Sequence, residues 1–178
     1  MRPMLHNILP PLLAVAALTA VPTVLAEHRE HGAHVHGVGQ LNVLIDGDLL
    51  AIELHTPALN IVGFEHHPHD SAQRAQLERA IAQLRDGAAL FELPAAAGCA
   101  LESVEVASDL LEPGPEPHAH ADVEASYHFR CATAAALNGM EARLFWLFPA
   151  TEKLDVQLVT PQGQRGAVLT PDRPHLAF

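Results

Sequence analysis

The fold is decided by residues 41–54, which read Leu41-Asn42-Val43-Leu44-Ile45-Asp46-Gly47-Asp48-Leu49-Leu50-Ala51-Ile52-Glu53-Leu54. Apolar side chains alternate with other side chains on both sides of Asp46-Gly47, as in strands that bury one face. Asp-Gly is one of the dipeptides preferred in tight hairpin turns. The stretch therefore predicts two antiparallel strands with a shared buried face, formed by Leu41, Val43, Ile45, Leu50, Ile52 and Leu54.

Short apolar segments separated by proline and glycine continue beyond the hairpin. They predict further strands at 89–93, 99–111, 122–131, 143–148, 153–160 and 164–169. The segment 143–148 is apolar on both faces, so we expect it to be a central strand that is covered on both sides.

One segment, residues 71–86, has a helical pattern instead. Asp70 and Gln73 fit a capping box at its start, and Gly87 stands where a helix C-terminus favours glycine. An apolar stripe that includes Leu77 runs between them. The sequence thus predicts an α+β fold that is mostly β, an antiparallel β-sandwich or partly open barrel of about 7–8 strands with one main helix at about 71–86.

The N-terminal residues 1–26 have the composition of a secretory signal peptide. Arg2 precedes an apolar stretch, and Ala26 supplies a small residue at the expected cleavage point. Prolines break the apolar stretch, so we expect no membrane insertion after cleavage. Residues 27–36 are expected to form a flexible histidine-rich arm and residues 37–178 a single domain, in the periplasm.

Charge and cysteine content narrow the possible partners. Lys and Arg number 10 against 21 Asp and Glu, and the resulting formal net charge of −11 argues against nucleic acid. Cys99 and Cys131 are the only cysteines, and such a pair in an oxidising compartment favours a disulfide. Their alternative use, as thiolate metal ligands, would require a reducing environment.

Histidine is the main chemical signal, because the chain has 13 histidines. They gather at 34–36, 66–69 and 118–122. Residues two apart on an extended backbone point the same way, so His34 and His36 can share a site. The same spacing recurs in His118, His120 and Asp122. Neutral imidazole is a good ligand for Zn²⁺, Cu²⁺ and Ni²⁺, so the pattern predicts a metal site.

The hairpin register adds one more candidate ligand. Pairing across Asp46-Gly47 places His55 on the face, and near the end, where His36 lies. Even-numbered residues from Asp122 onward are polar, which indicates a metal-capable strand face there. His66 is favoured among its neighbours because it follows Gly63-Phe64-Glu65.

Less demanding interpretations remain open for the same histidines. Those at 34–36 can be exposed residues of the arm, and those at 118–120 can be loop residues beside a solvated strand. We expect His28 and His31 to be bystanders, and His128 and His175 to be structural. No nucleophile elbow, phosphate loop or His-Glu-x-x-His helix occurs, so we expect no enzyme activity.

The chain resembles the ZrgA-type periplasmic zinc uptake proteins of Gram-negative bacteria. The resemblance covers nearly all of the chain after the signal segment. It is carried by His34-Val35-His36-Gly37, Asn60-Ile61-Val62-Gly63-Phe64-Glu65-His66, Cys99, His120-Ala121-Asp122, Tyr127-His128-Phe129-Arg130-Cys131 and 144–149. It implies a zinc-binding protein without catalytic activity that feeds a zinc import system.

The resemblance also implies ligand positions, at His34, His36, His66, His120 and Asp122, whereas His55 and His118 rest on register and spacing. Some members of this family look as though they carry a long His/Asp-rich insertion near residues 112–121, which is short here. That departure indicates one ordered site rather than storage of many ions.

The sequence therefore predicts an exported zinc-binding domain at 37–178 that captures Zn²⁺ and supports its uptake through an inner-membrane import system. Two alternatives remain: a periplasmic protein that handles copper or nickel, and a non-catalytic protein-interaction module with adventitious metal binding.

Overall fold

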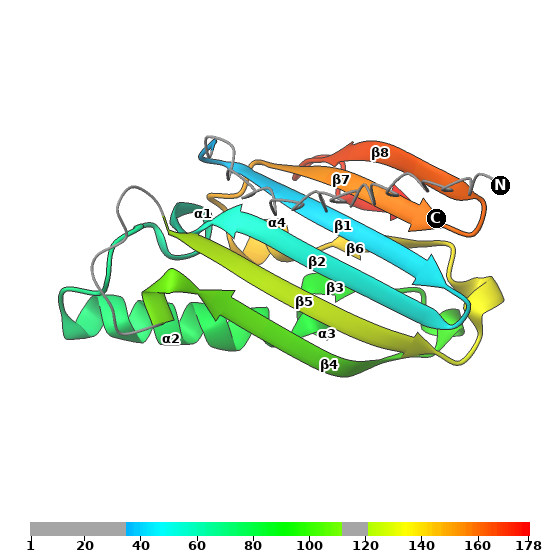
Figure 1. Cartoon of the computed structure of the whole chain (residues 1–178), viewed down its shortest axis with the longest axis horizontal. Coiled ribbons are helices and arrows are strands. Elements are labelled where there is room, and N and C mark those ends of the chain that lie inside the picture. Colours follow the sequence, from blue (N-terminus) through cyan, green and yellow to red (C-terminus); the bar gives the residue numbers. More distant parts are fainter. Residues whose placement is uncertain (1–34, 112–120) are drawn as a thin grey trace, which may run out of the picture. The chain divides into compact units, whose positions relative to one another are not determined.

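The computed structural model describes residues 35–111 and 121–178, which belong to one compact unit (Figure 1). The signal segment 1–26 and most of the predicted arm lie outside the described residues. The elements, in chain order, are β1 (Val38–Asp46), β2 (Leu49–Pro57), α1 (Ala58–Val62), α2 (Ser71–Leu84), α3 (Gly87–Leu90), β3 (Phe91–Glu92), β4 (Cys99–Ser108), β5 (Asp122–Cys131), β6 (Gly139–Ala142), α4 (Leu144–Leu147), β7 (Lys153–Thr160), β8 (Gly163–Leu169) and β9 (His175–Ala177).

The predicted hairpin forms β1 and β2 and is confirmed. Leu41 pairs with Leu54, and Val43 pairs with Ile52, so the apolar residues share one face. Gly47 has a φ of 61°, a conformation that glycine adopts at little cost. The turn residue and the alternation thus act together to fix the register.

The main sheet has six strands in the order β4-β5-β2-β1-β7-β8, and a second sheet has the order β3-β6-β9. The expected mostly β, sandwich-like α+β fold with one main helix is confirmed, and the large sheet does not close into a barrel. The described strands number nine rather than about 7–8. The large sheet is also mixed, because β7 pairs with β1 in parallel, which alternation alone does not reveal.

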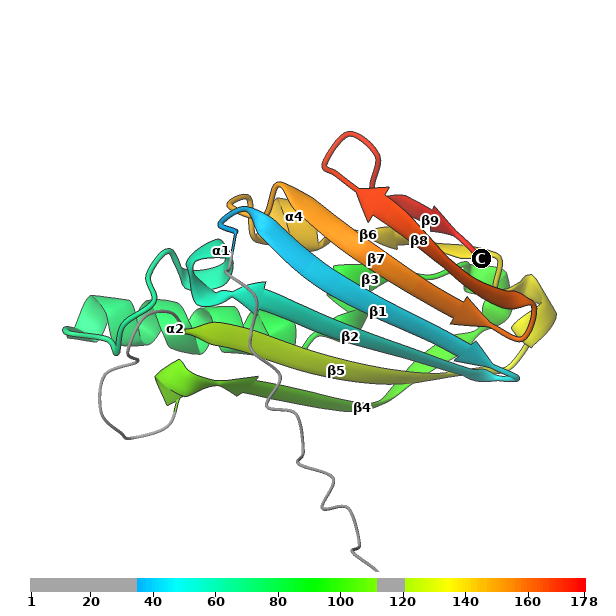
Figure 2. The ribbon, with the colours of Figure 1, turned by 45° about the horizontal axis from the view of Figure 1, so that its top comes forward.

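One face of the large sheet carries the helices and the small sheet (Figures 1 and 2). Alternation along each strand sends apolar side chains to this face, where Leu41, Ile52 and Tyr127 are fully buried. Polar residues such as Asn42 and Glu53 lie on the opposite face. Among the helices of the described ranges, none has the length and apolar character needed to cross a membrane.

Helix α2 begins where the capping pattern predicted. The Asp70 side chain accepts a hydrogen bond from the Gln73 backbone N–H (2.8 Å). The Gln73 side chain accepts one from the His69 N–H (2.8 Å), so it reaches one residue further back than in a standard capping box. This arrangement stabilises the start of α2 and the loop that precedes it.

The expected end of the main helix needs a correction. Helix α2 ends at Leu84, and Gly87 begins the short helix α3 rather than terminating α2. A Cβ atom at Gly87 would lie 2.7 Å from Cδ1 of Tyr127. Glycine is therefore needed here for close packing. The predicted strand at 89–93 is correspondingly reduced to Phe91–Glu92.

The predicted central strand at 143–148 is wrong, because residues Leu144–Leu147 form helix α4. Leu144, Phe145 and Phe148 are buried at the spacing of one helical face, whereas Trp146 is 57% exposed. A run this short has no periodicity that separates a covered strand from a helical turn.

The predicted disulfide is confirmed between Cys99 and Cys131. The two cysteines face each other at the end of the β4–β5 pair.

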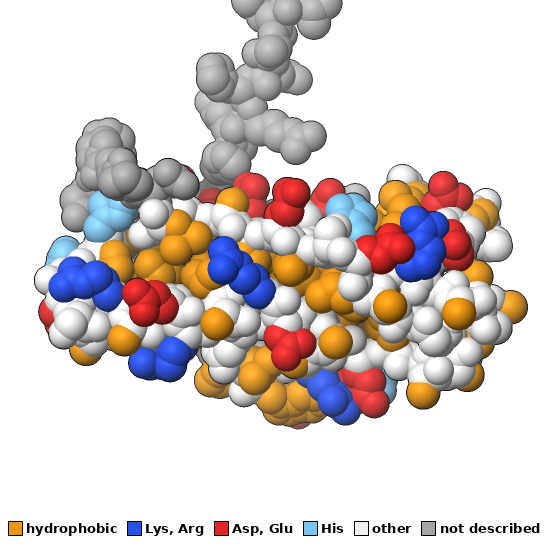
Figure 3. Space-filling model, turned by 90° about the horizontal axis from the view of Figure 1, so that it is seen from below, with side chains coloured by type: hydrophobic (Ala, Val, Ile, Leu, Met, Phe, Trp, Pro, Cys, Tyr) orange, Lys and Arg blue, Asp and Glu red, His pale blue; other side chains and the backbone are white. Residues whose placement is uncertain are grey.

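Strand β4 is an edge strand, and Figure 3 shows this side of the molecule with hydrophobic side chains between charged ones. Exposed Glu102 and Glu105 lie on β4, and charges on an edge strand disfavour pairing with another chain.

Tyr127 gives the core a measurable dependence on alkaline pH. Its hydroxyl donates a hydrogen bond to the Leu84 carbonyl (2.8 Å), and burial raises the pKa of Tyr127 above its ordinary value. The unfolded chain therefore ionises first, near pH 10. The contribution of Tyr127 to the free energy of unfolding is therefore complete below that pH. Above it, the free energy of unfolding should fall by about 1.4 kcal/mol per pH unit while folded Tyr127 stays protonated.

This prediction can be checked directly, because the chain has a single tyrosine. Tyrosinate absorbance of the folded protein should rise at higher pH than that of the urea-unfolded protein. The stability difference between the wild type and Tyr127→Phe should shrink over the same pH range. Coincident absorbance curves for the folded and unfolded protein would contradict the prediction.

Candidate metal site

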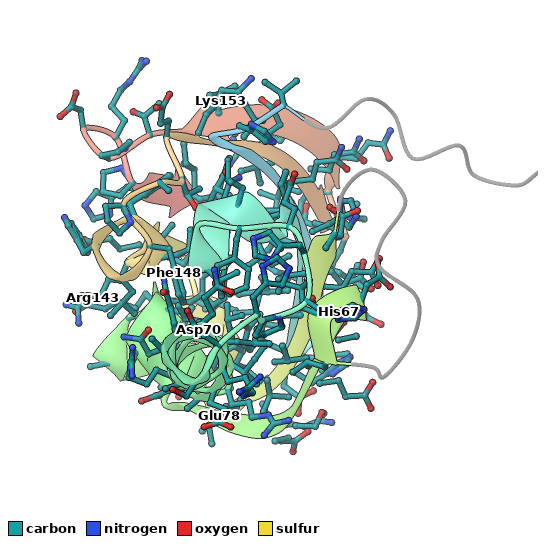
Figure 4. All side chains as sticks on the ribbon, turned by 90° about the vertical axis from the view of Figure 1, so that its left-hand side faces the viewer. His67, Asp70, Glu78, Arg143, Phe148 and Lys153 are labelled. Carbon is teal, nitrogen blue, oxygen red and sulfur yellow. A yellow bond between two sulfur atoms is a disulfide. The ribbon has the colours of Figure 1, made fainter. Side chains whose placement is uncertain are left out.

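The start of β1, the end of β2 and the start of β5 meet at one end of the large sheet. Gln40 of β1 pairs with His55, and His55 pairs with Glu124 of β5. Asp122 pairs with Pro57, directly before α1. The strand register therefore brings the histidine of β2 beside the carboxylates of β5. Figure 4 looks onto this end, where His67 and Asp70 are labelled.

His55 and Asp122, two of the residues predicted from the sequence, are in contact. Nε2 of His55 lies 3.3 Å from Oδ2 of Asp122 and 3.8 Å from Oε1 of Glu124. The side chains of His55 and Asp122 are 29% and 16% exposed, so both are partly shielded from water while remaining reachable. One imidazole and two carboxylates are nitrogen and oxygen donors of the kinds that bind Zn²⁺.

A second pair is formed by His36 and Glu65. Nε2 of His36 lies 3.4 Å from Oε2 of Glu65. The Glu65 side chain is 13% exposed and that of His36 is 52% exposed, so the carboxylate is held inside and the imidazole faces outward. Glu65 is not among the metal ligands that the sequence predicts. Its position next to His66 in a histidine-rich segment was the available signal.

The backbone beside His36 is fixed on both sides of Gly37. The Gly37 N–H donates to Oδ1 of Asn60 (2.7 Å). The Gly37 carbonyl accepts hydrogen bonds from the N–H groups of Glu152 (2.7 Å) and Lys153 (2.9 Å). Gly37 has a φ of 82°, which favours glycine. His36 thus precedes an ordered turn, although it belongs to the segment predicted to be a flexible arm.

His66 is held by a stack of rings and by a backbone contact. Its ring lies 5.2 Å from that of Phe64 and 4.1 Å from that of His69, with small interplanar angles of 24° and 15°. Nδ1 of His66 is 2.9 Å from the His67 carbonyl, which can only accept, so Nδ1 carries the proton. In the neutral ring the lone pair then lies on Nε2, as in many histidine metal ligands.

Two described histidines lie elsewhere. His128 contacts Ser103 (3.2 Å) further along β5, and His175 contacts Glu141 (3.1 Å) in the small sheet. His34, His118 and His120 lie outside the described residues. Within the ranges that are described, no three His, Cys, Asp or Glu residues form a ready metal-binding group. The described residues therefore supply two pairs at one end of the sheet.

Comparison with known proteins adds an independent finding. Residues 33–178 match the model of a family described as ZrgA family zinc uptake protein. The match spans every residue that the structure describes, so it includes both pairs and the strands that carry them. No curated protein matches the chain significantly.

Proposed function

The chain belongs to the ZrgA family of zinc uptake proteins, and on that premise we propose that it binds Zn²⁺ at the α1 end of the large sheet and supports its uptake. The observation that carries the proposal is the meeting of His55 with Asp122 and Glu124 on neighbouring strands. The His36–Glu65 pair supports it, because β1 is paired with β2 at the same end.

The proposed ligands come from two groups of residues. Those described by the structure contribute His36, His55 and Asp122, and His66 has its Nε2 lone pair available. The remainder are neighbours in sequence: His34 is two residues before His36, and His118 and His120 precede Asp122. Zn²⁺ needs about four such ligands, so only part of this set would bind one ion.

The carboxylates have a distinct role in this proposal. Glu65 and Glu124 lie against the imidazoles of His36 and His55, respectively. These are ion-pair distances, 3.4 Å for His36 and 3.8 Å for His55, so each carboxylate attracts its imidazole by charge and would orient it for an ion. Either carboxylate can also bind the cation directly, so both adjust the charge of the site.

The proposed physiological setting follows from the composition of residues 1–26 and from the family. The family is one of zinc uptake proteins rather than enzymes. A signal peptide at 1–26 would export the chain to the periplasm, where the domain at 37–178 would capture Zn²⁺ and pass it to an inner-membrane import system. The disulfide Cys99–Cys131 supports an oxidising compartment.

Zinc affinity should depend on pH, because a metal ligand must be a neutral imidazole. A free imidazole has a pKa of about 6.5, so at about pH 5.5 only about a tenth of it is neutral. Lowering the pH from about 7.5 to about 5.5 should weaken zinc binding, because protons then compete with the ion for each ligating imidazole. Calorimetric titration of the protein lacking residues 1–26 measures this, and equal affinity at the two pH values would contradict histidine ligation.

The same titration distinguishes a zinc-binding protein from the two alternatives, a copper or nickel protein and an interaction module that binds metal adventitiously. One tight ion that raises the melting temperature indicates a built site, whereas several weak ions without stabilisation indicate scattered surface histidines on an interaction module. The nitrogen-rich donor set also suits Cu²⁺ and Ni²⁺. Competition of these ions with Zn²⁺ therefore tests the proposal of a copper or nickel protein.

A further inference from the structure

Asn60 is a buried polar residue that binds the chain directly after His36. It is 2% exposed and lies in the middle of α1. Its Oδ1 accepts from the Gly37 N–H (2.7 Å), and its Nδ2 donates to the Val38 carbonyl (3.2 Å) and to Oγ1 of Thr56 (2.9 Å). Its amide thus joins the beginning of β1 to the end of β2.

These contacts determine where His36 is held. The side chain of Asn60 accepts a hydrogen bond from the Gly37 N–H, and the backbone N–H groups of Glu152 and Lys153 donate to the Gly37 carbonyl. The peptide plane that joins His36 to Gly37 is therefore oriented by Asn60, because that N–H belongs to it. The His36 imidazole is 52% exposed and reaches Oε2 of Glu65, so the orientation of this peptide sets the point from which the side chain extends to its partner.

The same short helix is tied to the other pair. The Ala58 N–H donates to the Ala121 carbonyl (2.8 Å), directly before Asp122. At its other end, Nε2 of Gln76 in α2 donates to the Val62 carbonyl (2.8 Å). Helix α1 therefore has a fixed relation both to the carboxylate of β5 and to the loop that contains Glu65.

We propose that Asn60 is a positioning residue for zinc binding: it holds His36 at α1, and α1 is registered on the start of β5, so that His36 and Asp122 face the same ion. Asn60 touches no metal in this scheme. The inference rests on the proposed function, because it assigns Asn60 a role in building that zinc site.

The test is a double-mutant cycle with zinc affinity as the readout. Asn60→Ala should weaken zinc binding by about tenfold, the lower end of the loss seen when a residue supporting a metal ligand is removed. In a His36→Ala background the same change should cost nothing further, because its effect passes through His36. Tyr127→Phe is the control: it removes another buried hydrogen bond and should lower stability without changing affinity.

The outcomes separate the inference from the proposed function. Unchanged affinity in Asn60→Ala, or equal losses in both backgrounds, overturns the positioning role. If the wild type binds no zinc, the proposed function fails. NMR of the metal-free protein then tests whether Asn60 positions His36. In that case, loss of the NMR contact between the His36 ring and Glu65 in Asn60→Ala supports positioning, and retention of the contact overturns it.

A second variant keeps the test valid if Asn60→Ala does not fold. Thr56→Val removes one partner of the Asn60 amide and preserves side-chain shape. It should produce a smaller loss of affinity that likewise disappears in the His36→Ala background. An affinity loss that persists there overturns the inference.

Discussion

Replacing Cys99 and Cys131 together by alanine should lower the free energy of unfolding by about 3–4 kcal/mol. The bond joins residues 32 apart in sequence, and its loss frees a loop of that length in the unfolded chain. Its position adds to the effect, because β4 is an edge strand with only β5 as a strand neighbour. The bond therefore fixes the start of β4 to the end of β5, the one strand with which β4 pairs.

Urea unfolding of the oxidised wild type, the reduced wild type and the double variant measures this effect. The reduced protein and the variant should unfold at similar, lower urea concentrations. Zinc affinity should change little, because Cys131 ends β5 and Asp122 begins it. A midpoint equal to that of the oxidised wild type would contradict the prediction.

The double change His36→Ala with His55→Ala should weaken zinc binding by at least about 100-fold. One imidazole is removed from each of the two pairs, and loss of even one residue that supports a metal ligand typically costs about 10–100-fold. Neither residue belongs to the buried core, so the fold should remain. Calorimetry together with thermal unfolding distinguishes loss of the site from loss of the structure.

A matched variant makes this result specific. His128→Ala with His175→Ala also removes two imidazoles, but from positions that contact Ser103 and Glu141. Its zinc affinity should equal that of the wild type. Equal losses in the two double variants would show that zinc binds to dispersed histidines, and the proposed site would be wrong.

The parts of the fold predicted from sequence are those set by neighbouring residues. The hairpin follows from alternation and Asp46-Gly47, and the start of α2 follows from Asp70 and Gln73. The cysteine pair was predictable because only two were present. The hairpin and the helix start are each set by residues that lie close together in the chain. The two cysteines can pair in only one way.

The wrong or missing predictions concern features whose structure is determined by packing between segments that are distant in the sequence. The run Leu144–Leu147 becomes a helical turn because it buries one side against the core and leaves Trp146 outside. Parallel pairing of β1 with β7 depends on the path of the intervening chain. Gly87 is placed by its approach to Tyr127, which no local pattern contains.

The site shows the same division. Register across the hairpin and strand parity selected His36, His55 and Asp122, and the structure brings His55 and Asp122 into contact. The roles of Glu65 and Asn60 were missed, because they arise from contacts with residues far away in sequence. The bond from Gly37 to Asn60, for example, crosses an entire hairpin.

The parallel pair β1–β7 also joins two segments that lie far apart in the chain. A chain made from its N-terminus has the β1–β2 hairpin long before Lys153–Thr160 exist to cover the other edge of β1. Pairing between such distant segments is slow, and an apolar strand with an open edge is prone to aggregate meanwhile. The carbonyl of Gly37 gains its two partners, Glu152 and Lys153, only in the same late step. The anchor beside His36 is therefore complete only once Lys153 and the rest of β7 have docked, so a newly made chain should reach the proposed affinity for zinc only after that step.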